Sequence, residues 1–199
     1  MTATPPFYHP SSEWNPATDH SGPWTEEDYE ALPEGLRAEL HDGSLILTPS
    51  PAPLHDLISR RLANLFAELL QDDELVHTAM DLRMADGRRF RTPDVMVLRA
   101  PAEIRPVPPG DVELVVEVLS PGGGCEWDTK MQVYAAAGIP AYLILEEKGG
   151  VVSGWHHELV NGKYALTAEA HDGEELFVVK PFTFTIDLTA LALRKRRYG

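Results

Sequence analysis

Two acidic residues occur inside segments that are otherwise typical of buried β-strands. Residues 112–121 read VELVVEVLSP, and Glu117 lies within their nearly unbroken apolar run. Asp94 follows Pro93 in RTPDVMVL, where the proline opens a second apolar segment. An ionised carboxylate that is buried in such a strand without a partner is costly. Two carboxylates on neighbouring strands of one sheet can converge on a divalent cation, and oxygen ligands of this kind suit Mg²⁺ or Mn²⁺.

Lys130 supplies a third chemical group, because it lies in EWDTKMQVYAAAG, a segment with a helical pattern that follows the Glu117 strand. A lysine in the first turns of that helix can orient or deprotonate an attacking water, or hold a phosphate oxygen. Metal, water and cation together make a hydrolytic phosphodiester site. The residues alone leave structural alternatives open. Asp94 could bond backbone amides, Glu117 could form a salt bridge with Lys130 or an arginine, and Lys130 could be solvated.

The surrounding pattern predicts the elements that would position these groups. The pattern predicts a helix at 54–70, followed by three strands at roughly 75–84, 93–99 and 112–119. A second helix at 126–138 and a fourth strand at 141–147 complete this core. The passage from 112 to 146 predicts two parallel strands joined by a helix. Before this core, Thr25 caps a short helix, and RAELHDGSLILT predicts a hairpin that turns at HDG. After it, residues 151–188 alternate β-type segments with turns at NGK and HDG.

Composition narrows the class of protein. A chain of 199 residues fits one domain with a sizeable core, and a formal net charge of −14 argues against a protein that coats nucleic acid. The single Cys125 cannot form an internal disulfide, and no apolar run approaches the ~18 residues of a membrane span, so we expect a cytoplasmic protein. Basic residues cluster at 87–91 and 194–197, where solvated loop and tail charges are the simplest interpretation.

Several segments together resemble a known bacterial family. They are PDV at 93–95, VVEVLSP at 115–121 and, after Lys130, YAAAGIPAYLIL at 134–145. In this order and spacing they are similar to the Uma-type family of putative restriction endonucleases, which belongs to the PD-(D/E)XK nuclease superfamily. The resemblance extends from about Tyr29 to Ala192. It implies an α/β, restriction-endonuclease-like fold with a mixed central sheet flanked by helices, an N-terminal hairpin and a β-rich C-terminal extension.

The resemblance also implies roles for individual residues. Asp94 and Glu117 would be the metal ligands, with Mg²⁺ or Mn²⁺ as cofactor, and Lys130 would assist the water or the phosphate. The superfamily motif has its lysine two residues after the glutamate, where this sequence has Leu119. In this family the lysine has moved to the following helix, at Lys130. The family's aspartate one helical turn earlier is replaced by Glu126.

Two further residues match features of the family. Glu39 lies in ELHDGSL, which matches the family's early hairpin, and it is a candidate third acidic contributor; an exposed hairpin glutamate is the alternative. His55 matches a histidine that is common at the start of the first long helix. A helix-start residue without a chemical role is the alternative for it.

We therefore predict a metal-dependent endonuclease that hydrolyses nucleic acid, with DNA as the expected substrate. Residues 1–23 would form an irregular arm, 24–193 the nuclease-like domain and 194–199 a basic tail. The net charge of −14 favours one alternative, a non-catalytic dimeric interaction module on the same fold. A third interpretation is an acidic domain that binds another protein, with its carboxylates solvated. A homodimer is expected because the C-terminal extension has more aromatic surface than one small sheet needs: Trp155, Phe177, Phe182 and Phe184.

Overall fold

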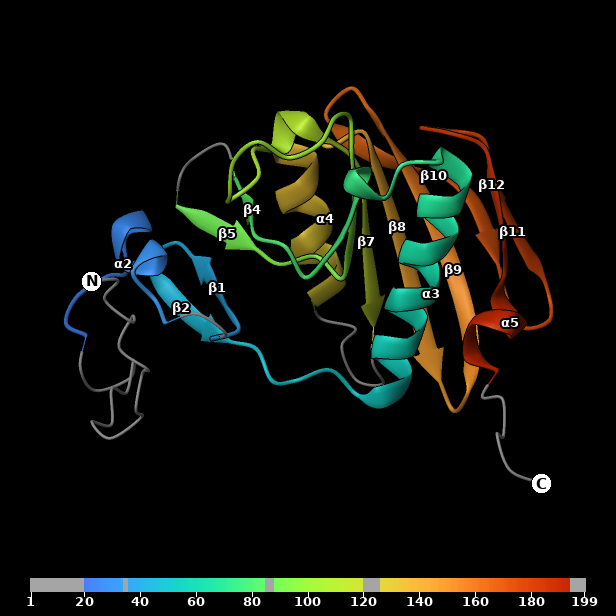
Figure 1. Cartoon of the computed structure of the whole chain (residues 1–199), viewed down its shortest axis with the longest axis horizontal. Coiled ribbons are helices and arrows are strands. Elements are labelled where there is room, and N and C mark those ends of the chain that lie inside the picture. Colours follow the sequence, from blue (N-terminus) through green and yellow to red (C-terminus); the bar gives the residue numbers. More distant parts are fainter. Residues whose placement is uncertain (1–19, 34–35, 85–87, 120–125, 194–199) are drawn as a thin grey trace, which may run out of the picture.

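The computed structural model describes residues 20–33, 36–84, 88–119 and 126–193, and a six-stranded mixed sheet forms its centre (Figure 1). The strand order is β10-β9-β8-β7-β6-β3. As predicted, β7 (Val112–Leu119) and β8 (Ala141–Lys148) are parallel, with helix α4 (Glu126–Ala136) between them in the chain. The remaining strands pair antiparallel: β3 (Val76–Thr78), β6 (Val95–Leu98), β9 (Val151–Val160) and β10 (Lys163–Ala170). The predicted mixed α/β fold is confirmed.

Two helices cover opposite faces of this sheet because side chains alternate along each strand. Helix α3 (Pro53–Leu70), predicted from its apolar periodicity, packs Ile58, Leu62 and Phe66 against one face. Residues from β6 and β7 complete this core: Val95, Val97, Leu114, Val116 and Val118. The opposite face packs around α4 with Met96, Val115, Leu119, Val133 and Tyr134. By this alternation Glu117 belongs to the face that α4 covers.

A second, smaller sheet precedes and flanks the central one, with the order β2-β1-β5-β4. The predicted hairpin is present as β1 (Ala38–His41) and β2 (Ser44–Leu47). Its two turn residues, Asp42 and Gly43, have φ of 49° and 83°, as a tight hairpin turn of type I′ requires. The short helix α2 (Glu26–Glu30) begins with the predicted Thr25 cap, and its Tyr29 packs with residues of β1 and β5.

The segment between α3 and β6 differs from the prediction. The single strand expected at 75–84 is divided between β3 in the central sheet and β4 (Leu82–Arg83) in the small sheet. The basic run at 87–91 also differs, because residues 89–91 form β5 (Arg89–Arg91) instead of a solvated loop. Phe90 is fully buried in the core of the small sheet, and Arg91 is 3% exposed. The other basic cluster, 194–197, lies outside the described residues.

The C-terminal extension completes the main core. Strands β11 (Glu175–Val178) and β12 (Phe184–Asp187) form a two-stranded sheet that is followed by α5 (Leu188–Ala192). Phe182 and Phe184 make edge contacts with Phe66 of α3, with ring centroids 5.7 and 5.2 Å apart. Phe184 is buried, whereas Phe177 is 57% exposed. The aromatic surface behind the dimer prediction therefore belongs largely to the protein's own core.

Two single 3₁₀ turns, Asp73–Leu75 and Pro109–Asp111, lead into β3 and β7. Of the predicted arm, only residues 20–23 fall within the described ranges. Within those ranges, no helix is long and apolar enough to cross a membrane.

Candidate active site

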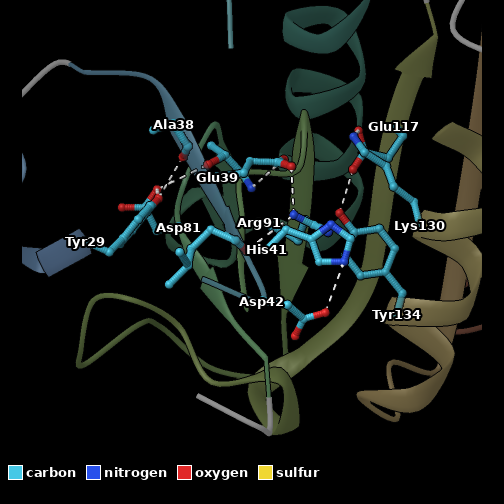
Figure 2. Close-up of polar contacts among 12 residues, drawn as sticks. Tyr29, Ala38, Glu39, His41, Asp42, Asp81, Arg91, Glu117, Lys130 and Tyr134 are labelled. Atoms are coloured by element: carbon cyan, nitrogen blue, oxygen red, sulfur yellow. Dashed lines mark hydrogen bonds and ion pairs between the residues drawn. The ribbon is translucent and has the colours of Figure 1, made fainter. Parts of the chain in front are cut away.

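The partners of the buried Glu117 carboxylate are two side chains of α4. Lys130 Nζ lies 2.8 Å from Oε2 of Glu117, and the Tyr134 hydroxyl donates to Oε1 over 2.6 Å (Figure 2). Lys130 and Tyr134 are four residues apart, so they project from the same face of the helix. Glu117 is only 3% exposed, and each of its oxygens has a protein donor in place of water. The salt bridge that the sequence left as an alternative is present.

Burial and charge together set the protonation of this cluster. Burial raises the pKa of Glu117 to about 7; the Lys130 ammonium opposes this rise, and the negative charge of Asp94 adds to it. Burial alone would lower the pKa of Lys130, but the negative charges of Glu117 and Glu39 outweigh it and raise that pKa. Lys130 is therefore an ammonium ion at neutral pH. It is suited to hold a water or a phosphate oxygen and not to remove a proton.

Asp94 reaches the same end of the sheet from the neighbouring strand. The antiparallel register of β6 and β7, continued by one residue, sets Asp94 opposite Glu117. Asp94 Oδ2 accepts the backbone N–H of Val118 over 2.7 Å and lies 3.2 Å from Nε2 of His55, in the first turn of α3. Asp94 thus accepts a hydrogen bond from a backbone amide, which was the structural alternative for this residue. Both contacts use Oδ2, so neither occupies Oδ1.

The ring of His55 belongs to this site through Asp94. Burial opposes protonation of the ring, but the hydrogen bond to Asp94 and its negative charge raise the pKa of His55 above its ordinary value. The side chains of His55 and Asp94 are 15% and 14% exposed. The two residues come from different layers, since α3 covers the face opposite the one that carries Glu117.

Asp94 and Glu117 fit a cation that needs few protein ligands. The two carboxylates interact, because the charge of Asp94 contributes to the raised pKa of Glu117. Among the residues that the structure describes, no three Asp, Glu, His or Cys side chains form a group that could hold a metal ion. Mg²⁺ keeps several waters and is commonly bound through one or two carboxylates, whereas structural zinc takes four protein ligands. The donor set is compatible with Mg²⁺ and, by its oxygen chemistry, with Mn²⁺.

Glu39 faces this cluster from the small sheet, but its own contacts are with that sheet. Arg91 Nη1 lies 3.1 Å from Oε2 of Glu39, and the backbone N–H of Thr92 donates to Oε1 over 3.3 Å. Figure 2 shows Glu39 and Arg91 beside the Glu117–Lys130 pair, and the charge of Glu39 contributes to the raised pKa of Lys130. Glu39 therefore acts on the cluster through its charge. Its side chain is 14% exposed, unlike that of the exposed hairpin glutamate that was the alternative.

Tyr134 and Arg91 contact the acidic residues Glu117 and Glu39, although neither was predicted as a site residue. A signal exists for Tyr134, since it follows Lys130 by four residues and so shares its helix face. Nothing in the run GRRFR separates Arg91 from the other arginines; only its burial in the small sheet does so. Leu119, where the superfamily has its lysine, is 7% exposed and packs in the α4-facing core. The side chain of Glu126 lies outside the described part of the structure.

Comparison with known proteins gives the family. The crystal structure of a putative nuclease belonging to DUF820, from Anabaena variabilis, is similar over 86% of this chain and 100% of its own, with a TM-score of 0.66. The two sequences are 16% identical, so the likeness concerns the fold. A search of curated proteins found no match. The family model described as Uma2, putative restriction endonuclease, matches residues 26–190, a range that contains Glu39, Asp94, Glu117 and Lys130. The chain therefore belongs to the Uma2 family of putative restriction endonucleases.

Proposed function

We propose that this protein is a metal-dependent endonuclease that hydrolyses phosphodiester bonds in nucleic acid. The observation that carries the proposal is the position of the Lys130 ammonium, 2.8 Å from the buried Glu117 carboxylate, at the end of the sheet to which Asp94 also belongs. A structural salt bridge needs only Lys130 and Glu117. The additional carboxylate of Asp94 in interaction range supports a cation site next to the ammonium.

Each side chain has a separate role in this proposal. Asp94 and Glu117 would hold Mg²⁺ or Mn²⁺, which when bound lowers the pKa of a water and stabilises charge on the phosphate. An ammonium has three N–H donors, and Glu117 engages one of them at Lys130; the others can hold the attacking water or a phosphate oxygen. Tyr134 fixes the Glu117 carboxylate by donating to its other oxygen.

The charges of the site favour a divalent cation and a phosphodiester. Asp94, Glu117 and Glu39 contribute three negative charges when ionised, and Lys130 and Arg91 contribute two positive ones. With His55 neutral, a divalent cation changes this net charge from −1 to +1, which would attract the single negative charge of a phosphodiester; a protonated His55 adds one further positive charge.

The charge of the whole chain argues in the other direction. At −14 it provides no general attraction to nucleic acid, so we expect binding that depends strongly on the cation. The description of the family as restriction endonucleases favours DNA as the substrate.

A cleavage assay combined with calorimetry tests the proposal. Duplex and single-stranded DNA and RNA would be incubated with the wild type and with Asp94→Ala in Mg²⁺, Mn²⁺ or EDTA. We expect cation-dependent cleavage and Mn²⁺ binding by the wild type, both lost in Asp94→Ala and both kept in the surface control Asp172→Ala. Equal Mn²⁺ binding by wild type and Asp94→Ala would contradict the ligand assignment. Mn²⁺ binding without cleavage of any substrate would favour the non-catalytic module.

A further inference from the structure

The Glu39 carboxylate is held by an arginine that lies inside the protein. The Arg91 side chain is 4% exposed, and its Nη1 donates to Glu39 over 3.1 Å and lies 3.5 Å from the backbone oxygen of Leu40. Its buried Nε has no hydrogen-bond acceptor within the described ranges. The charge of Arg91 is therefore paired while its hydrogen-bonding capacity is only partly used.

Strand register explains why these two residues meet. Leu40 is opposite Phe90 in the antiparallel pair of β1 and β5, and continuing this register sets Glu39 opposite Arg91. Residues opposite one another on a sheet face are the pairs that interact directly. Alternation along β1 buries Leu40 in the core that contains Phe90 and Tyr29, and it turns Glu39 to the other face, where its charge acts on Lys130.

Stability does not account for this ion pair. Removing two charges from water costs more than their attraction commonly returns unless their hydrogen bonds are complete, and those of Arg91 are not. Well-packed apolar residues at positions 39 and 91 would be at least as favourable for folding. The ion pair instead fixes the direction of a carboxylate, since both of its oxygens accept hydrogen bonds, from Arg91 Nη1 and from the Thr92 N–H.

We propose that Arg91 is a positioning residue, which holds Glu39 toward the Lys130 ammonium and so completes the negative charge that attracts the divalent cation. This inference rests on the proposed function and deepens it. The segment Arg91–Asp94 then contributes to two of the acidic groups of the site. Arg91 and the Thr92 amide hold the Glu39 carboxylate, and Asp94 supplies its own carboxylate. Arg91 acts through Glu39 and does not touch the substrate.

Five variants separate positioning from structural support: Arg91→Met, Arg91→Lys, Glu39→Gln, the double variant of Arg91→Met with Glu39→Gln, and Arg89→Met as a control. Arg89 lies on the same strand and pairs with Asp42 over 3.1 Å, away from Lys130. The measurements are melting temperature without metal, Mn²⁺ affinity by calorimetry, and kcat and KM for cleavage. Glu39→Gln keeps an oxygen for the Thr92 amide, so the double variant has no unpaired charge at either position.

Arg91→Met should lower the melting temperature by about 10 °C, because it leaves Glu39 without its partner. It should also lower kcat by at least about tenfold, with KM little changed, and weaken Mn²⁺ binding severalfold. The double variant should recover most of the melting temperature but neither kcat nor Mn²⁺ affinity. Arg91→Lys should recover part of the rate, and Arg89→Met should leave the rate unchanged.

Recovery of kcat and Mn²⁺ affinity together with stability in the double variant would overturn the inference, as would wild-type values of both in Arg91→Met. A wild type that binds Mn²⁺ but cleaves nothing contradicts the nuclease function alone, and the Mn²⁺ affinities of the variants then decide the role of Arg91. A wild type that binds no Mn²⁺ contradicts both proposals.

Discussion

Lys130 and Glu117 are separated by thirteen positions in the sequence, yet the ammonium of one lies 2.8 Å from the carboxylate of the other. The superfamily pattern has both residues on one strand, two positions apart and therefore on one face. Here the strand position is occupied by the buried Leu119, and the charge comes from the adjoining helix. We propose that the Lys130 ammonium takes the role of the lysine in that pattern, although a different element carries it.

If Lys130 acts in place of a lysine on the strand, a lysine at position 119 should restore part of the cleavage rate that is lost without Lys130. Lys130→Ala should reduce cleavage by about 100-fold or more, because a preorganised cation at the reacting phosphate is lost. Adding Leu119→Lys should restore part of the rate, since position 119 shares the β7 face with Glu117. The rescue should be incomplete and the double variant less stable by about 2 kcal/mol, because a buried leucine is lost. The measurement is cleavage rate at saturating Mn²⁺, with Leu119→Met as control. Cleavage by Lys130→Ala at the wild-type rate would rule out this role for Lys130.

Mn²⁺ affinity should depend on pH. With the pKa of Glu117 at about 7, protons compete with the cation below neutrality, so affinity falls as the pH falls. For one competing proton, the affinity at pH 6 should be about tenfold weaker than at pH 8. Tyr134→Phe removes a hydrogen bond to the anion, which raises the pKa of Glu117 and moves this dependence to higher pH. Calorimetry at several pH values measures both effects, and an affinity independent of pH between 6 and 8 would contradict competition between a proton on Glu117 and the cation.

A second pH effect concerns stability and arises on β9, two strands away from β7 in the central sheet. His156 on β9 is fully buried, with Nδ1 2.8 Å from the Thr167 hydroxyl, and burial lowers its pKa to about 4. Between pH 4 and 6.5 the unfolded chain binds the proton more tightly, so the free energy of unfolding rises with pH in this window. His156 should contribute about 2 kcal/mol to the change in the free energy of unfolding from pH 5 to 7.5, and this contribution should be absent in His156→Gln.

Urea unfolding of both proteins at pH 5 and 7.5 measures this difference. The opposite contribution of Glu117, whose raised pKa makes unfolding easier as the pH rises above about 4.5, is common to both proteins and cancels in the comparison. Identical pH dependence in wild type and His156→Gln would show that His156 is not the group responsible.

The homodimer remains a prediction, and exposed apolar residues of the C-terminal extension are candidates for its interface. Phe177 and Val179 are 57% and 60% exposed next to one another in the C-terminal sheet region, whereas Phe184 is buried. Sedimentation at high micromolar concentration should give about twice the chain mass of 22.0 kDa for the wild type and a monomer for Phe177→Glu. Ile104→Glu, which changes an equally exposed residue elsewhere, should leave the dimer intact. A wild-type monomer would contradict the prediction.

Local patterns in the sequence account for the main elements and for the acidic candidates. Helix α3, the hairpin at Asp42–Gly43 and the parallel strands around α4 follow from apolar period, turn residues and a C-terminal glycine, all of which act within a few residues of the chain. Asp94 and Glu117 were recognisable because a carboxylate inside an apolar strand has few physical explanations. Tyr134 could have been added by its spacing from Lys130.

Tertiary structure alone decided which charges meet. The residues 75–84 divide between two sheets, and Arg91 is buried against Glu39, because pairing partners from distant segments compete for the same strand edges. No local pattern distinguishes Arg91 from Arg88 or Arg89. The protonation of Glu117 depends likewise on the burial and charges supplied by α4 and β6, and these exist only when the separate elements have packed.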